Sequence, residues 1–217
     1  MCQVYIRSRV SCVDKSIAKS NKVVYSRIMT KLRKLGEVAE IHSGYSFRGA
    51  VIDVETGVSV VQARDIDGLY VKADELPQVL QHFSSSRMLN HGDVLLTARG
   101  SFRAAIVGFD KLAVASSSLF VLRLKDSSYL SEFLALYLSS SQAQSYLVQS
   151  AKGATIQSLS VNDLAGLSIP VVSKERQKLI VGLQQNVEAQ TSLLRSKLDI
   201  VNDIYIGAIN KNLKGVA

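Results

Sequence analysis

The feature that most constrains the fold is a long C-terminal segment without proline, from Ser173 to about Leu213. Apolar residues recur in this segment at the seven-residue spacing of paired helices. One series is apolar throughout: Ile180, Val187, Leu194, Val201 and Ala208. The second series is interrupted by polar residues: Leu183, Gln190, Lys197, Ile204 and Lys211. The pattern predicts one long amphipathic helix.

The length of that helix indicates how it is used. A helix of about 40 residues extends about 60 Å, whereas a compact domain of about 140 residues is only about 30 Å across. Half of the helix must therefore project, and its apolar stripe needs a partner in water. We predict an antiparallel coiled coil with a second copy of the chain. The predicted dimer contacts are Ile180, Leu183, Val187, Leu194, Val201, Ile204 and Ala208. The alternative is a segment folded back on itself at Gly182 or Gly207.

The residues before this helix predict a mixture of strands and helices. Short apolar runs rich in β-branched residues predict strands, at 57–63, 93–98, 104–108 and 118–124. Helical spacing predicts a helix with a serine cap over 127–140, a second helix directly after it, and a short helix before an extended exit that ends at Pro170. Residues 35–41 fit either a helical turn or a strand. The expected fold class is α+β, a mixed domain followed by the long helix.

Charge divides the chain into an arm and a body. Nine of the 26 lysines and arginines lie in the first 34 residues, beside a single acidic residue, Asp14, and the remainder is balanced. A basic arm is suited to polyanion contact, or it is only a solvated extension. The predicted organisation is an arm over 1–33, a domain over 34–172 and the helix over 173–217.

Several classes of protein do not fit the sequence. Cys2 and Cys12 give neither a disulfide framework nor a metal-binding spacing. No apolar run approaches a membrane span, and no signal-peptide pattern is present, which favours a cytoplasmic protein without membrane contact. Phosphate-loop and serine-hydrolase motifs are absent. Two acidic pairs, Asp53 with Glu55 and Asp65 with Asp67, lack the following lysine of a nuclease site. We therefore predict no catalytic site, no metal and no cofactor.

The stretch "LLTARGSFRAAIVG" (95–108) sets two arginines around a turn. A phosphate-binding loop needs several glycines that open a helix, but this stretch has Gly100 between two β-type runs. It therefore predicts a hairpin, in which Phe102 anchors the turn to the domain and Arg99 and Arg103 project from its rim.

Three stretches carry a family resemblance: "KLGEVAEIHSGYSFRGA" (34–50), "HGDVLLTARGSFRAAIVG" (91–108) and "KGATIQSLSVNDLAGLSIPVVSKERQKLI" (152–180). Their order resembles the specificity subunits of type I restriction-modification systems. In that family a Leu-Gly-acidic entry leads to a Ser-Gly turn, and a Gly-Asp strand leads to an Arg-Gly-Ser turn. A Gly-x5-Leu segment, here Gly153 to Leu159, then precedes Ile-Pro and a helix that opens with Glu-(Arg)-Gln, here Glu175 to Gln177.

The resemblance implies a target recognition domain followed by a long spacer helix. Such subunits read part of a split DNA sequence and hold the methyltransferase subunit, and sometimes the endonuclease subunit, on it. They usually carry two recognition domains and two antiparallel helices. This chain has one of each and resembles half a subunit, which a second copy would complete.

DNA reading requires side chains that match base edges, such as arginine with guanine and glutamine with adenine. The candidates on predicted loops are Tyr45, Arg48, Gln62, Arg64, Arg99, Ser101, Arg103, Lys152 and Gln157. Among them, lysine and serine are expected to contact phosphate. The alternative function is a coiled-coil scaffold protein without DNA specificity.

Overall fold

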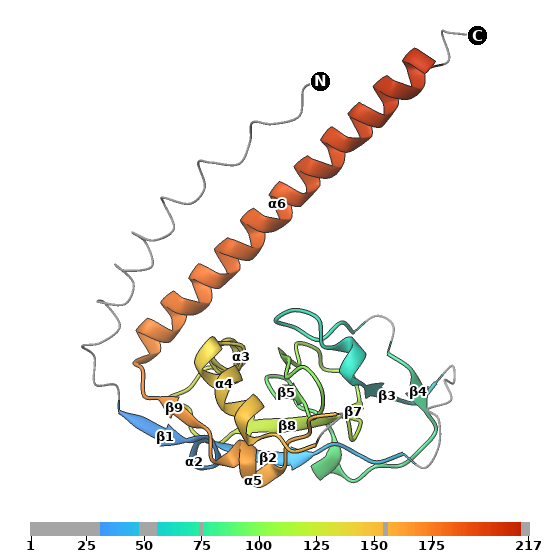
Figure 1. The fold of residues 1–217 in the computed structure, drawn as a ribbon. Helices are drawn as coiled ribbons and strands as arrows, with labels where there is room; N and C mark the ends of the chain where they lie inside the picture. The colour runs from blue at the N-terminus through green and yellow to red at the C-terminus, as the bar shows by residue number, and fades with distance from the viewer. Residues whose placement is uncertain (1–30, 48–55, 74–75, 154–155, 214–217) are drawn as a thin grey trace.

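The computed structural model describes residues 31–47, 56–73, 76–153 and 156–213. They form a mixed domain from which one long helix projects (Figure 1). The strands are β1 (Leu32–Lys34), β2 (Ala39–Ser43), β3 (Val58–Val61), β4 (Gln78–Val79), β5 (Val94–Thr97), β6 (Ala104–Ile106), β7 (Ala113–Ala115), β8 (Leu119–Leu124) and β9 (Ser168–Pro170). The helices are α2 (Leu35–Val38), α3 (Ser131–Leu138), α4 (Ser141–Ser150), α5 (Val161–Ala165) and α6 (Lys174–Leu213), with single 3-10 turns η1 (Ala63–Asp65) and η2 (Ser85–Arg87). The predicted fold class is confirmed.

In the part of the chain that the structure describes, the β structure consists of two sheets and one small two-stranded ribbon. Antiparallel strands form the first sheet in the order β2-β8-β5-β6, and the second sheet has the order β4-β3-β7, with β3 and β7 parallel. The third unit is the antiparallel pair of β1 and β9. Strands β7 and β8 belong to different sheets and are joined by the turn at Ser116–Ser118. This turn therefore lies where the two sheets meet.

The core has two layers because β5 is covered on both faces. Successive side chains of a strand point to opposite faces. Val94 and Leu96 accordingly lie in the core shared with α3, α4 and α5, whereas Leu95 packs in the core shared with β7. All four residues of β5 are buried. Burial on both faces explains why this strand reads as a continuous apolar run and not as an alternation.

The ambiguous residues 35–41 form both predicted structures in succession. Leu35 and Val38 are buried on the single turn of α2, and β2 then begins at Ala39. The serine cap predicted for the helix over 127–140 is wrong. Leu130 precedes α3 and makes no side-chain cap, because residues 126–129 form their own turn, in which the Ser128 N–H donates to Asp126 (2.8 Å). A serine cap occurs one helix later, at Ser140 of α4.

The chain enters and leaves the domain at the same place. Strand β1 pairs with β9, with Leu32 opposite Pro170, and the Val171 N–H donates to the Lys31 carbonyl (2.8 Å). The structure thus places Leu32 and Arg33 within the domain, although the predicted arm extends to residue 33. Residues 1–30 of that arm lie outside the described residues.

The C-terminal segment is one unbroken helix of 40 residues, so the alternative of a break at Gly182 or Gly207 is wrong. Figure 1 shows α6 leaving beside β9 and extending well beyond the domain. Gln177, Val181, Gln184 and Glu188 lie on the side of α6 that faces the domain. Because an α-helix has 3.6 residues per turn, the predicted dimer contacts are centred about a third of a turn around the helix axis from this side. Six of them are therefore exposed as large apolar side chains: Ile180, Leu183, Val187, Leu194, Val201 and Ile204. None of the described helices has the length and apolar content needed to cross a membrane.

Candidate nucleic-acid interface

The turn at Ser116–Ser118 connects three of the loops that carry candidate residues. The loop after β2 joins it because the Tyr45 N–H donates to the Ala115 carbonyl (2.7 Å) and the Tyr45 carbonyl accepts from the Ser117 N–H (2.7 Å). The end of β3 joins it through the Ser116 N–H, which donates to Val61 (2.8 Å), and the end of β5 through Ala98, whose N–H donates to Ser118 (2.8 Å). We call this segment the serine turn.

Close contact at the serine turn requires a glycine. A Cβ placed on Gly44 would lie 2.0 Å from the Ser116 carbonyl oxygen and 2.8 Å from that of Ala115. No side chain fits there without backbone movement. Gly44 is the glycine of the Ser-Gly turn in the first motif, and its role is close backbone approach.

The 3-10 turn after β3 brings Gln62, Arg64 and Arg103 together. The Ala63 N–H donates to the Ser118 hydroxyl (3.2 Å), while its carbonyl accepts from Nη2 of Arg103 (2.9 Å). The Gln62 N–H donates to the Asp65 carboxylate (2.7 Å), which closes the turn. The Arg64 side chain is 67% exposed, with Nε 3.8 Å from the Asp65 carboxylate. The Arg103 guanidinium therefore contacts the short turn that carries Arg64, although the two arginines are far apart in sequence.

The hairpin predicted for residues 95–108 is confirmed. β5 and β6 pair in antiparallel register, with Leu96 opposite Ala104, and Gly100 has a φ of 71°, which glycine adopts without strain. Phe102 is buried in the main core as the predicted anchor. Thr97 fixes the turn, since its hydroxyl accepts from the Arg103 N–H (2.9 Å) and donates to the Ser101 carbonyl.

Residues 152–159 pack against the tip of this hairpin. The Gly100 N–H donates to the Gln157 carbonyl (3.0 Å), and the Leu159 N–H donates to Ala98 (3.1 Å). Lys152 and Ser158 exchange two backbone hydrogen bonds of 2.9 Å. The third motif is thereby held beside the second. Its candidates adjoin those of the hairpin, and all of these side chains are exposed: Arg99, Ser101, Lys152 and Gln157.

Tyr45 has structural partners for both its ring and its hydroxyl. The ring packs edge-on against Phe47 and Phe83, with centroids 4.9 and 5.1 Å away. The hydroxyl accepts from Nε2 of Gln81 (2.7 Å). Arg48, the ninth candidate, lies outside the described residues.

Two exposed residues of this region were not among the sequence candidates. Ser117 lies on the serine turn, and Gln81 presents its amide beside Tyr45. The three consecutive serines between apolar runs are a turn signal that could have identified the first. Nothing local marks Gln81, because its position depends on a contact with a residue 36 positions away.

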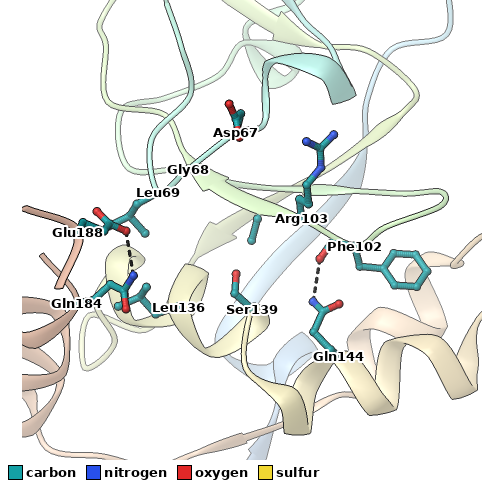
Figure 2. A pocket seen from close by; sticks show the side chains of 11 residues that line it. Asp67, Gly68, Leu69, Phe102, Arg103, Leu136, Ser139, Gln144, Gln184 and Glu188 are labelled. Atoms are coloured by element: carbon teal, nitrogen blue, oxygen red, sulfur yellow. Dashed lines mark hydrogen bonds between the residues drawn. The ribbon is translucent and has the colours of Figure 1, made fainter. Parts of the chain in front are cut away.

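A groove of about 440 Å³ separates this region from α6 (Figure 2). It is lined by Arg103 on the domain side and by Gln184 and Glu188 on the helix, where the Gln184 amide donates to Glu188 (3.0 Å). On the domain side of the groove, the Lys72 ammonium donates to the Asp67 carboxylate (2.8 Å). This hydrogen bond lowers the pKa of the Asp67 carboxyl, and the positive charge of Arg103 makes a smaller contribution in the same direction. Gln144 bonds the Phe102 carbonyl (2.8 Å) and so ties the hairpin to α4.

The site therefore offers exposed guanidinium, ammonium and amide donors on several loops that are joined by backbone hydrogen bonds. Within the described ranges, no three His, Cys, Asp or Glu side chains are grouped so as to hold a metal ion. Such donors suit the recognition of base edges and phosphates.

Comparison with known proteins identifies the protein family to which the chain belongs. Residues 29–202 match the family model of the type I restriction modification DNA specificity domain. Because this match covers most of the sequence, the chain belongs to that family. The family description names a specificity domain and not a catalytic subunit, in agreement with the prediction that the chain is not an enzyme. No curated protein shares significant sequence similarity with it.

Three solved structures have a similar fold. The first comes from work on complex assembly and conformational transition of the type I R-M system, and it has a TM-score of 0.60 at 20% sequence identity. The match covers 83% of this chain and 45% of the chain in that structure. The type I system S subunit from M. genitalium has a TM-score of 0.55 at 18% identity, with 82% and 44% covered. The HsdS subunit from Thermoanaerobacter tengcongensis has a TM-score of 0.55 at 19% identity, with 83% and 46% covered. The chain thus spans a little under half the length of these proteins.

The role of Gly44 gives a direct test of the serine turn. Gly44→Ala should destabilise the domain by about 1–3 kcal/mol, as expected for an overpacked site, because the new methyl group meets the Ser116 carbonyl. Denaturant unfolding measures this. Gly182→Ala is the control, since a Cβ at Gly182 meets nothing within 4 Å and should stabilise α6. Equal stability of Gly44→Ala and the unmutated protein would contradict the close approach.

Proposed function

We propose that this chain is a non-catalytic DNA sequence-recognition subunit of a type I restriction-modification system, which reads one half-site of a split DNA target. The observation that carries the proposal is the attachment of three candidate-bearing loops to the serine turn, with a fourth segment packed on the hairpin. Family membership supports it independently.

Among the candidates, the arginines and glutamines are suited to base edges. Arg99, Arg64 and Gln157 are exposed on separate loops, and Arg103 is exposed apart from its bond to the Ala63 carbonyl. Ser101 and Lys152 adjoin the hairpin tip and are assigned to phosphate. The balanced charge of the body is compatible with DNA binding because these cations are gathered on joined loops. The basic arm would add sequence-independent attraction to phosphate.

We further propose that α6 forms an antiparallel coiled coil with a second copy. The exposed apolar stripe of α6 requires a cover in water, and a second copy of the same helix presents a matching apolar stripe. A two-fold homodimer would supply the second recognition domain and would read a palindromic split site. The methyltransferase subunit, and in some systems the endonuclease subunit, would dock on this dimer.

A scaffold protein without DNA specificity would also use the stripe. It would have no need for exposed arginines on joined loops, so the DNA-reading function is favoured.

The first test replaces the hairpin arginines. Arg99→Ala and Arg103→Ala should leave the melting temperature nearly unchanged, because both side chains are on the surface. At least one should lose about 1–3 kcal/mol of discrimination between the preferred and a scrambled duplex. Fluorescence anisotropy at matched salt measures both affinities, on a preferred duplex selected from a randomised pool. Arg195→Ala, an exposed arginine on α6, is the control. Unchanged discrimination in both variants would remove these arginines from the interface.

The second test concerns the stripe. Val187→Asp combined with Leu194→Asp should convert a dimer into a monomer, because two carboxylates would be buried at the contact. Sedimentation equilibrium at micromolar concentration measures the mass. Gln185→Asp with Ser192→Asp introduces the same charges on the opposite side of α6 and should leave the dimer intact. An unmutated protein that sediments as a monomer would overturn the dimer.

A further inference from the structure

One polar side chain of α6 is completely buried where the helix leaves the domain. Gln177 has 0% of its surface exposed. Its Nε2 donates to the carbonyls of Ser128 (2.8 Å) and Val172 (2.8 Å), and its Oε1 accepts from the Leu130 N–H (2.8 Å). Both amide hydrogens and the amide oxygen therefore have partners. Such a fully satisfied buried amide permits one arrangement of the groups around it.

The partners of Gln177 belong to parts of the domain that are themselves fixed. Val172 lies in the connection from β9, and Leu130 directly precedes α3. Ser128 is held by Asp126, which also forms an ion pair with Arg33 on β1. Hydrogen bonds from Ser128, followed by the bond from Arg33, lower the pKa of the Asp126 carboxyl to about 2. The carboxylate is therefore ionised at neutral pH, and a continuous polar network runs from β1 to α6.

The anchor of α6 on the domain is short. After Gln177 the next buried residue is Val181, and all described side chains of α6 beyond it are exposed or only half-buried. Most of the 40-residue helix thus projects from the domain, and the buried residues among its described side chains all lie in the turn from Gln177 to Val181. Leu194, at the centre of the apolar stripe, lies about 30 Å along the helix from its start. A change of 10° at the base would displace that point by about 5 Å, which exceeds the 3.4 Å step of one base pair.

We propose that Gln177 is a positioning residue for DNA recognition: its three hydrogen bonds fix the direction of α6 and thereby the separation of the two half-sites that a dimer reads. This inference rests on the proposed homodimeric, split-site function. Gln177 touches no DNA. It acts through the helix, by excluding other angles between α6 and the recognition domain.

The first experiment separates half-site affinity from spacing. Duplexes selected from a randomised pool by the unmutated protein supply the half-sites, and the spacer is then changed by one base pair at a time. The unmutated protein should prefer one spacer at least tenfold over its neighbours. Gln177→Met keeps the side-chain length without the hydrogen bonds, and it should reduce this preference below threefold while single half-site affinity stays within twofold. Gln185→Met, an exposed glutamine on the same helix, is the control. A preference retained in Gln177→Met would overturn the proposal.

The second experiment needs no DNA. Spin labels at Asp110→Cys and Asn202→Cys, with Cys2 and Cys12 replaced by serine, report the distance between domain and helix. Mixing with excess unlabelled protein isolates distances within one copy. The unmutated background should give one narrow distribution, and Gln177→Met and Gln177→Glu should broaden it at least twofold, because the glutamate has no amide hydrogens for the two carbonyls.

The two experiments distinguish the possible failures. A broad distribution in the unmutated background overturns the proposal even if every Gln177 variant fails to fold. A narrow distribution in folded Gln177→Met also overturns it. A protein that binds no duplex refutes the proposed function, whereas the distance measurement still decides whether Gln177 fixes the helix.

Discussion

The arrangement of the loops that carry the candidate residues depends on backbone hydrogen bonds around the serine turn. Tyr45, Val61 and Ala98 all bond this turn through their main chains, so these attachments of the three loops are made by backbone atoms and not by side chains. Position 44 requires glycine, because the loop after β2 approaches the serine turn too closely for a Cβ. A scaffold of this kind allows exposed side chains to differ while the loop positions stay the same.

The core supports this arrangement from both sides. β5 is buried against the helices on one face and against the second sheet on the other, and it ends at Thr97, where the hairpin turn begins. Phe102 then returns into the helix-side core. Arg99 and Arg103 flank this anchored turn, and both are exposed. Burial of one aromatic residue and exposure of two cations are thus parts of the same turn.

The sequence could predict the features that local pattern determines. The four longer apolar runs gave β3, β5, β6 and β8, and the heptad series gave α6 as one helix. Strands β1, β4 and β7 were missed, because they have only two or three residues each and exist through pairing with distant partners. Strand β2 was one of two alternatives for residues 35–41, and β9 was expected only as an extended exit that ends at Pro170. The same reason limits prediction of the site. Hairpin geometry and the burial of Phe102 follow from local spacing, whereas the bond between Arg103 and Ala63 spans 40 residues and leaves no local signal.

The central claim is that the loops joined by the serine turn form the DNA-reading surface. Hydrogen–deuterium exchange with and without a duplex selected from a randomised pool tests it most directly. The account predicts slower exchange on binding over 98–103, 116–118 and 156–159, with the outer half of α6 unchanged by DNA at constant dimer concentration. Exchange that slows elsewhere, and stays the same across these three segments, would contradict it.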